Sequence, residues 1–191
     1  VSANLEGDHL VGSELAIQSI EYLLENYQTD EAVKKALDEH VFYFLPRVNP
    51  DGAMNERDGE WYPIRQSSQV WDPEFIGLPA GTRAPWYYSS SRQGYDLNRD
   101  SNPNLDFRIE NLADYGWTSD EFAEDILNDR SMNNSRYGGY YVTPEARIIT
   151  SVYQQLQPDV YIDVHHRGFN YLTDEDIRSV SIQVAAEVAD P

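Results

Sequence analysis

Three polar clusters hold the residues of this sequence whose types and spacing suit chemistry. They are Glu6-Gly7-Asp8-His9, Asp96-Leu97-Asn98-Arg99 and Asp163-Val164-His165-His166. Glu6 and His9 are three positions apart on a turn that enters a predicted helix, so both side chains can reach one ion. His165, at the end of a predicted strand, would complete a set of two imidazoles and one carboxylate, which is the ligand count of a catalytic zinc site with one position left for water. Asp163, two residues before His165, is placed to orient that ligand.

Each cluster also has a plain structural interpretation when it is taken alone. A single histidine is more often a surface residue, or one whose hydrogen bonds are satisfied, than a metal ligand. The tetrapeptide at 6–9 is equally unspecific by itself. The three clusters together favour a metal site, because ligands of open α/β sheets bind beyond the carboxyl ends of the strands, where these clusters would meet.

Composition narrows the classes of function. The 191 residues include 14 Lys or Arg and 33 Asp or Glu, which gives a formal net charge of -19. A chain with this negative charge repels phosphate backbones and anionic bilayers. We therefore expect no nucleic-acid partner. Because the acids are scattered, we interpret them as a solvated surface rather than as a site for a cationic partner. The chain has no cysteine, which excludes disulfides, thiolate metal sites and a cysteine nucleophile and restricts any metal to histidine and carboxylate ligands.

The sequence shows no feature of a membrane-spanning protein. Its longest apolar runs, such as 41–45, are far too short to cross a bilayer, so we expect no membrane insertion. No basic region followed by an apolar stretch opens the chain, so a signal peptide is not visible. The location that we favour is secreted or periplasmic, with the signal already removed.

Strands and amphipathic helices alternate along the chain. Apolar, β-prone runs predict strands at 1–5, 41–45 and 160–164, the last two buried on both faces. Helical periodicity and capping residues predict helices at 12–27, 30–39, 120–127 and 174–188, and one that begins at Pro144 and stops at Pro158. This alternation predicts an α/β fold with a mixed, largely parallel central sheet flanked by helices. We interpret 1–191 as a single domain whose loop-rich region, about 53–134, is typical of functional loops.

These motifs, in this order, resemble the zinc carboxypeptidases of the M14 type. The ligand pair at 6–9 is followed by Val11-Gly12-Ser13-Glu14, and later come Asn49-Pro50-Asp51-Gly52, Asp96-Leu97-Asn98-Arg99, Pro144-Glu145 and Asp163-Val164-His165. The resemblance covers nearly the whole chain, and Asp-Leu-Asn-Arg is its most specific short match. It implies a zinc carboxypeptidase-like fold, here incomplete at both ends, one zinc ion held by Glu6, His9 and His165, and hydrolysis of the last peptide bond of a substrate with a free C-terminal carboxylate.

The resemblance also implies roles for residues outside the ligand set. Asn98 and Arg99 would grip the terminal carboxylate of the substrate, for which an amide and a planar guanidinium are suited. A further arginine would polarise the scissile carbonyl and stabilise the oxyanion. Arg92 is the nearest candidate for this catalytic role and Arg83 is the alternative.

Two departures from the family pattern stand out. The first ligand pair is inverted, with Glu6 before His9, and Asp96, which would steady the first ligand, would then face a carboxylate. This leaves the identity of the metal open. The general-base glutamate of the family lies well downstream of the third ligand, whereas only 26 residues follow His165 here. We therefore expect the general base to lie outside this chain.

Three functions remain open on these grounds. The first is a metallocarboxypeptidase. The second is a carboxypeptidase-like binding module without turnover, which the inverted pair and the missing base would favour. The third is a zinc deacylase or amidase that acts on amino-acid conjugates.

Overall fold

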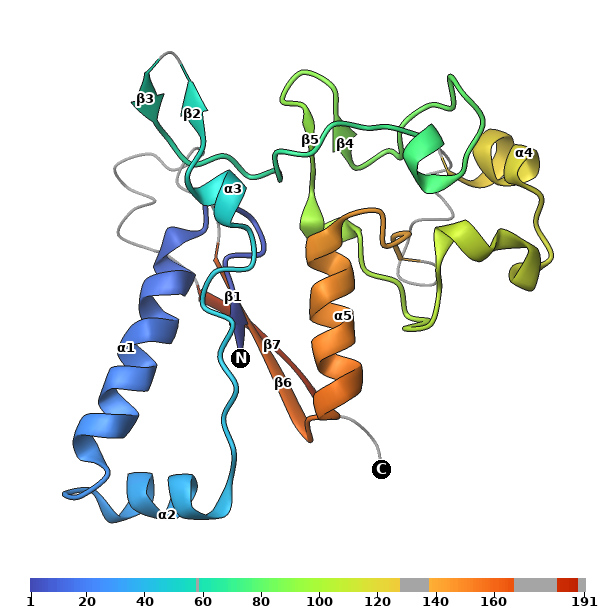
Figure 1. The fold of residues 1–191 in the computed structure, drawn as a ribbon. Helices are drawn as coiled ribbons and strands as arrows, with labels where there is room; N and C mark the ends of the chain where they lie inside the picture. Colours follow the sequence, from blue (N-terminus) through green and yellow to red (C-terminus); the bar gives the residue numbers. More distant parts are fainter. Residues whose placement is uncertain (58, 128–137, 167–181, 189–191) are drawn as a thin grey trace. The chain divides into compact units, whose positions relative to one another are not determined.

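The computed structural model describes residues 1–57, 59–127, 138–166 and 182–188, which belong to two compact units (Figure 1). The first unit comprises Val1–Arg65 together with the described part of Pro158–Pro191, and the second is Gln66–Gln157. The first contains β1 (Ser2–Ala3), α1 (Leu10–Asn26), α2 (Glu31–Glu39), α3 (Pro50–Ala53), β2 (Glu56–Arg57), β3 (Glu60–Trp61), β6 (Val160–His166) and β7 (Ile182–Val188). The second contains η1 (Glu74–Ile76), β4 (Tyr88–Ser89), β5 (Gly94–Tyr95), η2 (Leu97–Arg99), η3 (Ile109–Tyr115), α4 (Ser119–Glu121), η4 (Phe122–Ile126) and α5 (Pro144–Leu156).

The first unit is organised by a three-stranded sheet in the order β1-β6-β7. β1 and β6 are parallel, with Ser2 opposite Asp163 and Ala3 opposite Val164, whereas β6 and β7 are antiparallel. The sheet is therefore mixed, and helices accompany it, as an α/β fold requires. Because the carboxyl ends of parallel strands lie at the same edge, the turn after β1 and the end of β6 come together.

Helix α1 packs against β1 and β6 at close range. Ala16 of the helix lies in a buried cluster with Ala3 and Val164, and Phe44 and Ile162 pack against that cluster. Gly12 allows the close approach, because a Cβ at this position would lie 3.0 Å from the carbonyl oxygen of Val164. Small residues at this contact hold the N-terminal end of α1 against the sheet.

The structure confirms most of the predicted elements. The helices predicted at 12–27 and 30–39 are α1 and α2, the second of which begins at the predicted Asp30, whose side chain accepts from two backbone N–H groups of the first turn. The helix predicted at 120–127 is α4 followed by the π-helix η4. The helix from Pro144 is α5, and the strand at 160–164 is part of β6.

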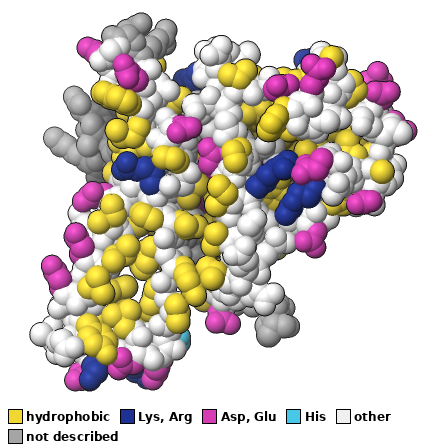
Figure 2. All heavy atoms as spheres, in the orientation of Figure 1, with side chains coloured by type: hydrophobic (Ala, Val, Ile, Leu, Met, Phe, Trp, Pro, Cys, Tyr) yellow, Lys and Arg dark blue, Asp and Glu magenta, His cyan; other side chains and the backbone are white. Residues whose placement is uncertain are grey.

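The prediction of a buried strand at 41–45 is wrong. Within this segment only Leu45 makes a strand bridge, to Ser2, and Val41 and Tyr43 are 77% and 51% exposed. The backbone that lies beside this segment is that of residues 1–3. The first of its hydrogen bonds runs from the Val1 amino group to the Tyr43 carbonyl oxygen, at 2.7 Å. Figure 2 shows hydrophobic side chains on the surface of the region that holds α1 and α2. The side chains of Val41, Phe42 and Tyr43 are exposed, whereas Phe44 is partly buried and packs against the cluster around Ala16.

The helix predicted at 174–188 is also wrong over its second half. Residues 182–188 form β7, which pairs with β6 along its whole length, from Val160 opposite Val188 to His166 opposite Ile182. Positions 174–181 lie outside the described residues. Backbone pairing with a neighbouring strand outweighed the helical periodicity, in a segment that carries three β-branched residues.

The second unit is built around an aromatic core and one buried carboxylate. Tyr87, Tyr95, Phe107, Phe122 and Tyr140 are almost fully buried. They are joined by ring contacts between 5.0 and 6.4 Å. The short elements of the loop-rich region thus enclose a core of their own.

Asp100, fully buried, joins the turn after η2 to the start of α5. Its Oδ1 accepts hydrogen bonds from the Tyr87 hydroxyl (2.7 Å) and the Val142 N–H (3.0 Å). Its Oδ2 accepts from the N–H (2.7 Å) and the hydroxyl (2.6 Å) of Thr143, the residue that caps α5. Burial raises the pKa of Asp100, and these hydrogen bonds oppose that shift. Four donors fill both oxygens, so the carboxylate form is the one that fits.

In the part of the chain that the structure describes, no helix is both long enough and apolar enough to cross a membrane.

We predict that Asp100→Asn destabilises the protein by about 3 kcal/mol, because an amide would turn two N–H donors toward donors of Tyr87, Val142 or Thr143. Urea unfolding followed by tryptophan fluorescence and circular dichroism measures the change. Asp114→Asn, an exposed neutralisation in the same unit, is the matched control, with an expected change below about 0.5 kcal/mol. Equal unfolding midpoints for the two variants would contradict the role given to Asp100.

Candidate metal centre

The turn that carries Glu6 and His9 is held by buried asparagines. Asn4, which ends β1 with a positive φ of 62°, donates from Nδ2 to the carbonyl oxygens of Glu6 (3.1 Å) and Gly7 (3.0 Å). The His9 N–H donates to the Glu6 carbonyl oxygen at 2.9 Å, and α1 begins directly after His9. Glu6 and His9 are thereby fixed on one tight turn, as their spacing predicts.

The Asn-Pro-Asp-Gly motif supports this turn from the other side. Asn49 caps the short helix α3 by accepting from the Gly52 N–H at 2.9 Å, and its own Nδ2 lies 3.4 Å from the carbonyl oxygen of Leu5. Gly7 faces α3 so closely that a Cβ would overlap the Gly52 backbone and the Ile64 carbonyl oxygen. The Gly7 N–H donates to the Arg65 carbonyl oxygen at 3.0 Å. The motif therefore acts on the site through the backbone.

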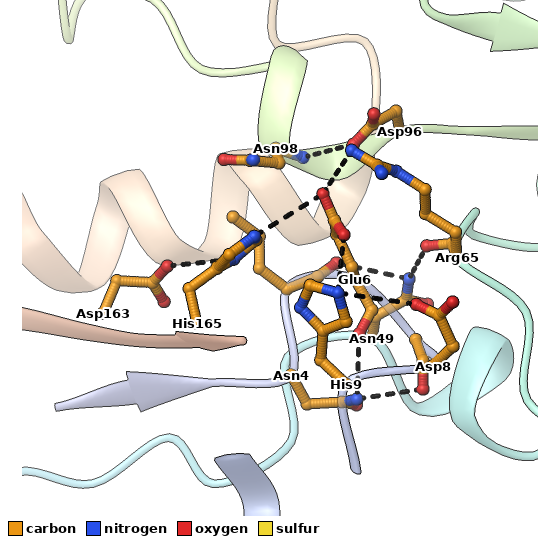
Figure 3. A network of polar contacts seen from close by, with 12 residues as sticks. Asn4, Glu6, Asp8, His9, Asn49, Arg65, Asp96, Asn98, Asp163 and His165 are labelled. Carbon is orange, nitrogen blue, oxygen red and sulfur yellow. Dashed lines mark hydrogen bonds and ion pairs between the residues drawn. The ribbon is translucent and has the colours of Figure 1, made fainter. Parts of the chain in front are cut away.

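The three predicted metal ligands lie together (Figure 3). Glu6, His9 and His165 each offer one ligand atom, and these atoms all lie within 4.8 Å of one another. His9 Nε2 is 2.8 Å from Glu6 Oε2, and His165 Nε2 is 3.7 Å from Glu6 Oε1. The two imidazoles meet edge to face, with 4.5 Å between ring centroids. Two nitrogens and one oxygen, converging from the turn after β1 and from the end of β6, form a donor set that suits zinc.

Charges around the cluster favour the forms that bind a cation. Burial opposes ionisation of Glu6, but the hydrogen bond from His9 and the charges of His9, Arg65 and His165 outweigh burial and lower the pKa of Glu6. Burial lowers the pKa of His165, which favours the neutral imidazole that a metal needs. Burial raises the pKa of the neighbouring Asp8. The carboxylate and the imidazole are thus both held in their metal-binding forms.

Asp163 lies beside His165, as predicted, but at the long distance of 3.8 Å between Oδ2 and Nδ1. That separation is an electrostatic contact rather than a hydrogen bond. Its other oxygen accepts from the Ser2 hydroxyl at 2.6 Å, and Ser2 in turn lies 2.6 Å from the Tyr161 hydroxyl. Asp163 is therefore anchored by β1 next to the third ligand.

Arg65 is the site residue that sequence reasoning missed. Its guanidinium contacts Glu6, with 2.5 Å between Nη2 and Oε1, and its side chain is 32% exposed. Arg92 and Arg83, the predicted candidates for the catalytic arginine, lie shortly before Asp96 in the sequence. Arg65 lies further upstream, 13 residues after the Asn-Pro-Asp-Gly motif. The signal that could have found it is this motif, because the segment that follows it returns to the site turn.

The similarity of this chain to a known protein family covers most of its length. The family model described as zinc carboxypeptidase matches residues 1–172. The chain belongs to this family. The family is zinc-dependent and acts on the C-terminal peptide bond of its substrates, so the terms hydrolase, protease, carboxypeptidase and metal-binding apply to it.

Individual relatives in this zinc carboxypeptidase family are distant. Carboxypeptidase M of Mus musculus is 28% identical over 127 residues, which are 62% of this chain and 23% of that protein. Carboxypeptidase D of Homo sapiens is 35% identical over 71 residues, or 36% of this chain and 5% of that protein. The chain thus matches less than a quarter of the length of these relatives. No solved structure matches it significantly.

The other predicted site residues of this member of the zinc carboxypeptidase family lie in the second unit. Asp96 caps η2 by accepting from the Asn98 N–H at 3.2 Å, and the exposed Arg99 donates to the Asn98 carbonyl oxygen at 3.0 Å. Arg92 is exposed and lies 3.3 Å from the Gln66 side-chain oxygen, and Arg83 is exposed as well. The orientation of Asp96 toward the first ligand and the substrate contacts of Asn98, Arg99 and Arg92 stay predictions.

We predict that Glu6→Ala and His9→Ala each lower zinc affinity at least about tenfold, because each removes one of three protein ligands. Metal analysis after dialysis against a defined zinc buffer measures the loss. His40→Ala removes an exposed histidine of the same unit and should leave the zinc content unchanged. Unchanged zinc in both ligand variants would refute the assignment of Glu6 and His9.

Proposed function

We propose that this protein is a zinc metallocarboxypeptidase that releases the C-terminal residue of peptides. The observation that carries the proposal is the convergence of Glu6, His9 and His165 in a chain of the zinc carboxypeptidase family. The inverted order of the first pair keeps the number and type of ligands, so the donor set fits one zinc ion. A bound zinc would supply an activated water and polarise the peptide carbonyl.

Arg65 is our candidate for the arginine that stabilises the developing oxyanion, in place of Arg92. It belongs to the same unit as the three ligands, and its guanidinium already lies at the Glu6 carboxylate. Arg92 belongs to the other unit and is exposed, with a side-chain partner in Gln66. A guanidinium that borders the predicted metal ligands could donate a charge-assisted hydrogen bond to an oxyanion formed there.

Asn98 and Arg99 are proposed to bind the terminal carboxylate. Asp96 caps the start of η2, and Asp100, the residue that follows η2, is held by hydrogen bonds to Thr143. The backbone that presents the two side chains is therefore fixed at both ends. The Arg99 guanidinium is exposed and can still turn its planar edge to a carboxylate. Substrate selection by a free C-terminus follows from this pair.

Among the described residues we assign no general base. Glu187 lies in β7, but the register places it opposite Tyr161 and places Gln183 opposite His165. Strand residues rise about 3.3 Å each, so Glu187 is remote from the third ligand along the strand. The proton transfer of the proposed reaction is therefore left to a group outside the described residues.

We predict that the zinc-loaded protein cleaves a peptide with a free C-terminal carboxylate and not its C-terminal amide, because the amide offers no anion to Arg99. Arg99→Ala should raise KM at least about tenfold, since a charge-assisted pair is lost. Liquid chromatography with mass detection measures release of the terminal residue. Arg47→Ala, which removes an exposed arginine, is the control for net charge.

Three outcomes would count against this function. Equal cleavage of the acid and the amide would remove the basis of carboxylate recognition. Binding of the acid peptide with no release of product would favour a binding module without turnover. Hydrolysis of N-acylated amino acids but of no peptide would favour the deacylase or amidase alternative.

A further inference from the structure

The Glu6 carboxylate is fully engaged by groups of the protein itself. Its Oε1 contacts the Arg65 guanidinium at 2.5 Å and its Oε2 contacts His9 Nε2 at 2.8 Å, while the side chain is only 2% exposed. A lone buried carboxylate would be expensive, and Arg65 supplies the charge that offsets that cost. The carboxylate that would hold a metal therefore already has a cation beside it.

Two cations cannot share this carboxylate without repulsion. A metal on Glu6 would lie within a few ångströms of the guanidinium, where the screening by water is incomplete. A hydrogen bond from a guanidinium to the charged carboxylate also lowers the basicity of that carboxylate, which makes it a weaker ligand. Both effects act in one direction and weaken metal binding.

We propose that Arg65 competes with the metal for Glu6 and thereby sets the metal affinity of this site. Binding exchanges one cation for another on the Glu6 carboxylate, with no proton released from Glu6. The inference rests on the proposed function, because it takes Glu6 as a ligand. It follows from the inverted ligand order, which places a carboxylate at position 6 beside Arg65.

The structure allows the exchange to be a side-chain movement. The Arg65 backbone is fixed, since its carbonyl oxygen accepts from the Gly7 N–H at 3.0 Å and lies 3.4 Å from Asn49 Nδ2. Its side chain is 32% exposed and has solvent to move into. Asp8 and Asp163 lie 3.8 Å from the imidazoles of His9 and His165. Their negative charges keep the site attractive for a cation after the guanidinium has moved.

The exchange would couple metal loading to the second role that we propose for Arg65. In this structure the guanidinium contacts the Glu6 carboxylate. Once a metal takes that carboxylate, the guanidinium is released beside the metal centre, where the scissile carbonyl would bind. Arg65 would thus become available to the substrate only when a metal is bound.

Zinc titration against a chromophoric chelator, at about pH 8 so that Glu6 stays ionised in every variant, tests the proposal. Arg65→Met, which keeps the apolar stem and removes the charge, should bind zinc at least about tenfold more tightly than the wild type. Arg65→Lys, which keeps the charge and loses the planar fork, should fall between the two. Arg47→Met removes an exposed arginine of the same unit and should change the affinity less than about twofold. A zinc affinity of Arg65→Met equal to or below that of the wild type would overturn the proposal.

A second measurement covers the case in which Arg65→Met does not fold. In the wild-type protein with ¹⁵N-labelled arginine, the Arg65 side-chain N–H signal should shift on zinc titration and saturate at one equivalent. No change of that signal at saturating zinc would overturn the competition. The zinc affinity of Glu6→Ala separates the ligand assignment from the role of Arg65. If Glu6→Ala binds zinc with wild-type affinity, the ligand assignment fails. If Glu6→Ala loses zinc affinity while Arg65→Met keeps the wild-type affinity, only the role of Arg65 is rejected.

Discussion

The parallel pairing of β1 with β6 is the constraint on which the candidate site depends. Two register contacts, Ser2 with Asp163 and Ala3 with Val164, bring together segments that lie about 160 residues apart in the sequence. They align the turn that carries Glu6 and His9 with the strand end that carries His165. A shift of the register by one residue would turn the His165 side chain to the other face of the sheet, because side chains alternate along a strand. The relative positions of the three predicted metal ligands therefore depend on the pairing of a very short strand, β1.

Hydrogen bonds from asparagine side chains to the backbone, together with close backbone packing, protect that geometry. Asn4 and Asn49 bond to carbonyl groups of the turn, and Gly7 lies against α3 where no side chain fits. The Asn-Pro-Asp-Gly motif is thus a structural support of the site in this chain. The second unit has a comparable anchor in Asp100, whose four hydrogen bonds join the turn after η2 to Tyr87 and to the first residues of α5.

Residue type and spacing predicted the ligand cluster, and helical periodicity predicted the helices, because both signals are local. The errors arose where a long-range partner decides the structure. β7 is a strand because β6 pairs with it, and residues 41–43 are exposed because little backbone lies beside them. Arg65 was missed for the same reason: its proximity to Glu6 comes from the path of the chain after α3, for which the Asn-Pro-Asp-Gly motif is the local signal. The substrate-binding roles of Asn98 and Arg99 depend on positions relative to the ligands and stay predictions.

The ion pair between Arg65 and Glu6 bears on whether folding of the protein depends on metal binding. Many small metal sites consist of like charges that repel one another until an ion arrives, so those proteins fold only with their metal. Here the Arg65 guanidinium contacts the buried Glu6 carboxylate and offsets its charge. If Glu6 is a ligand, as we propose, the turn that carries it would not need an ion to compensate this charge, and folding and metal binding would be separate events.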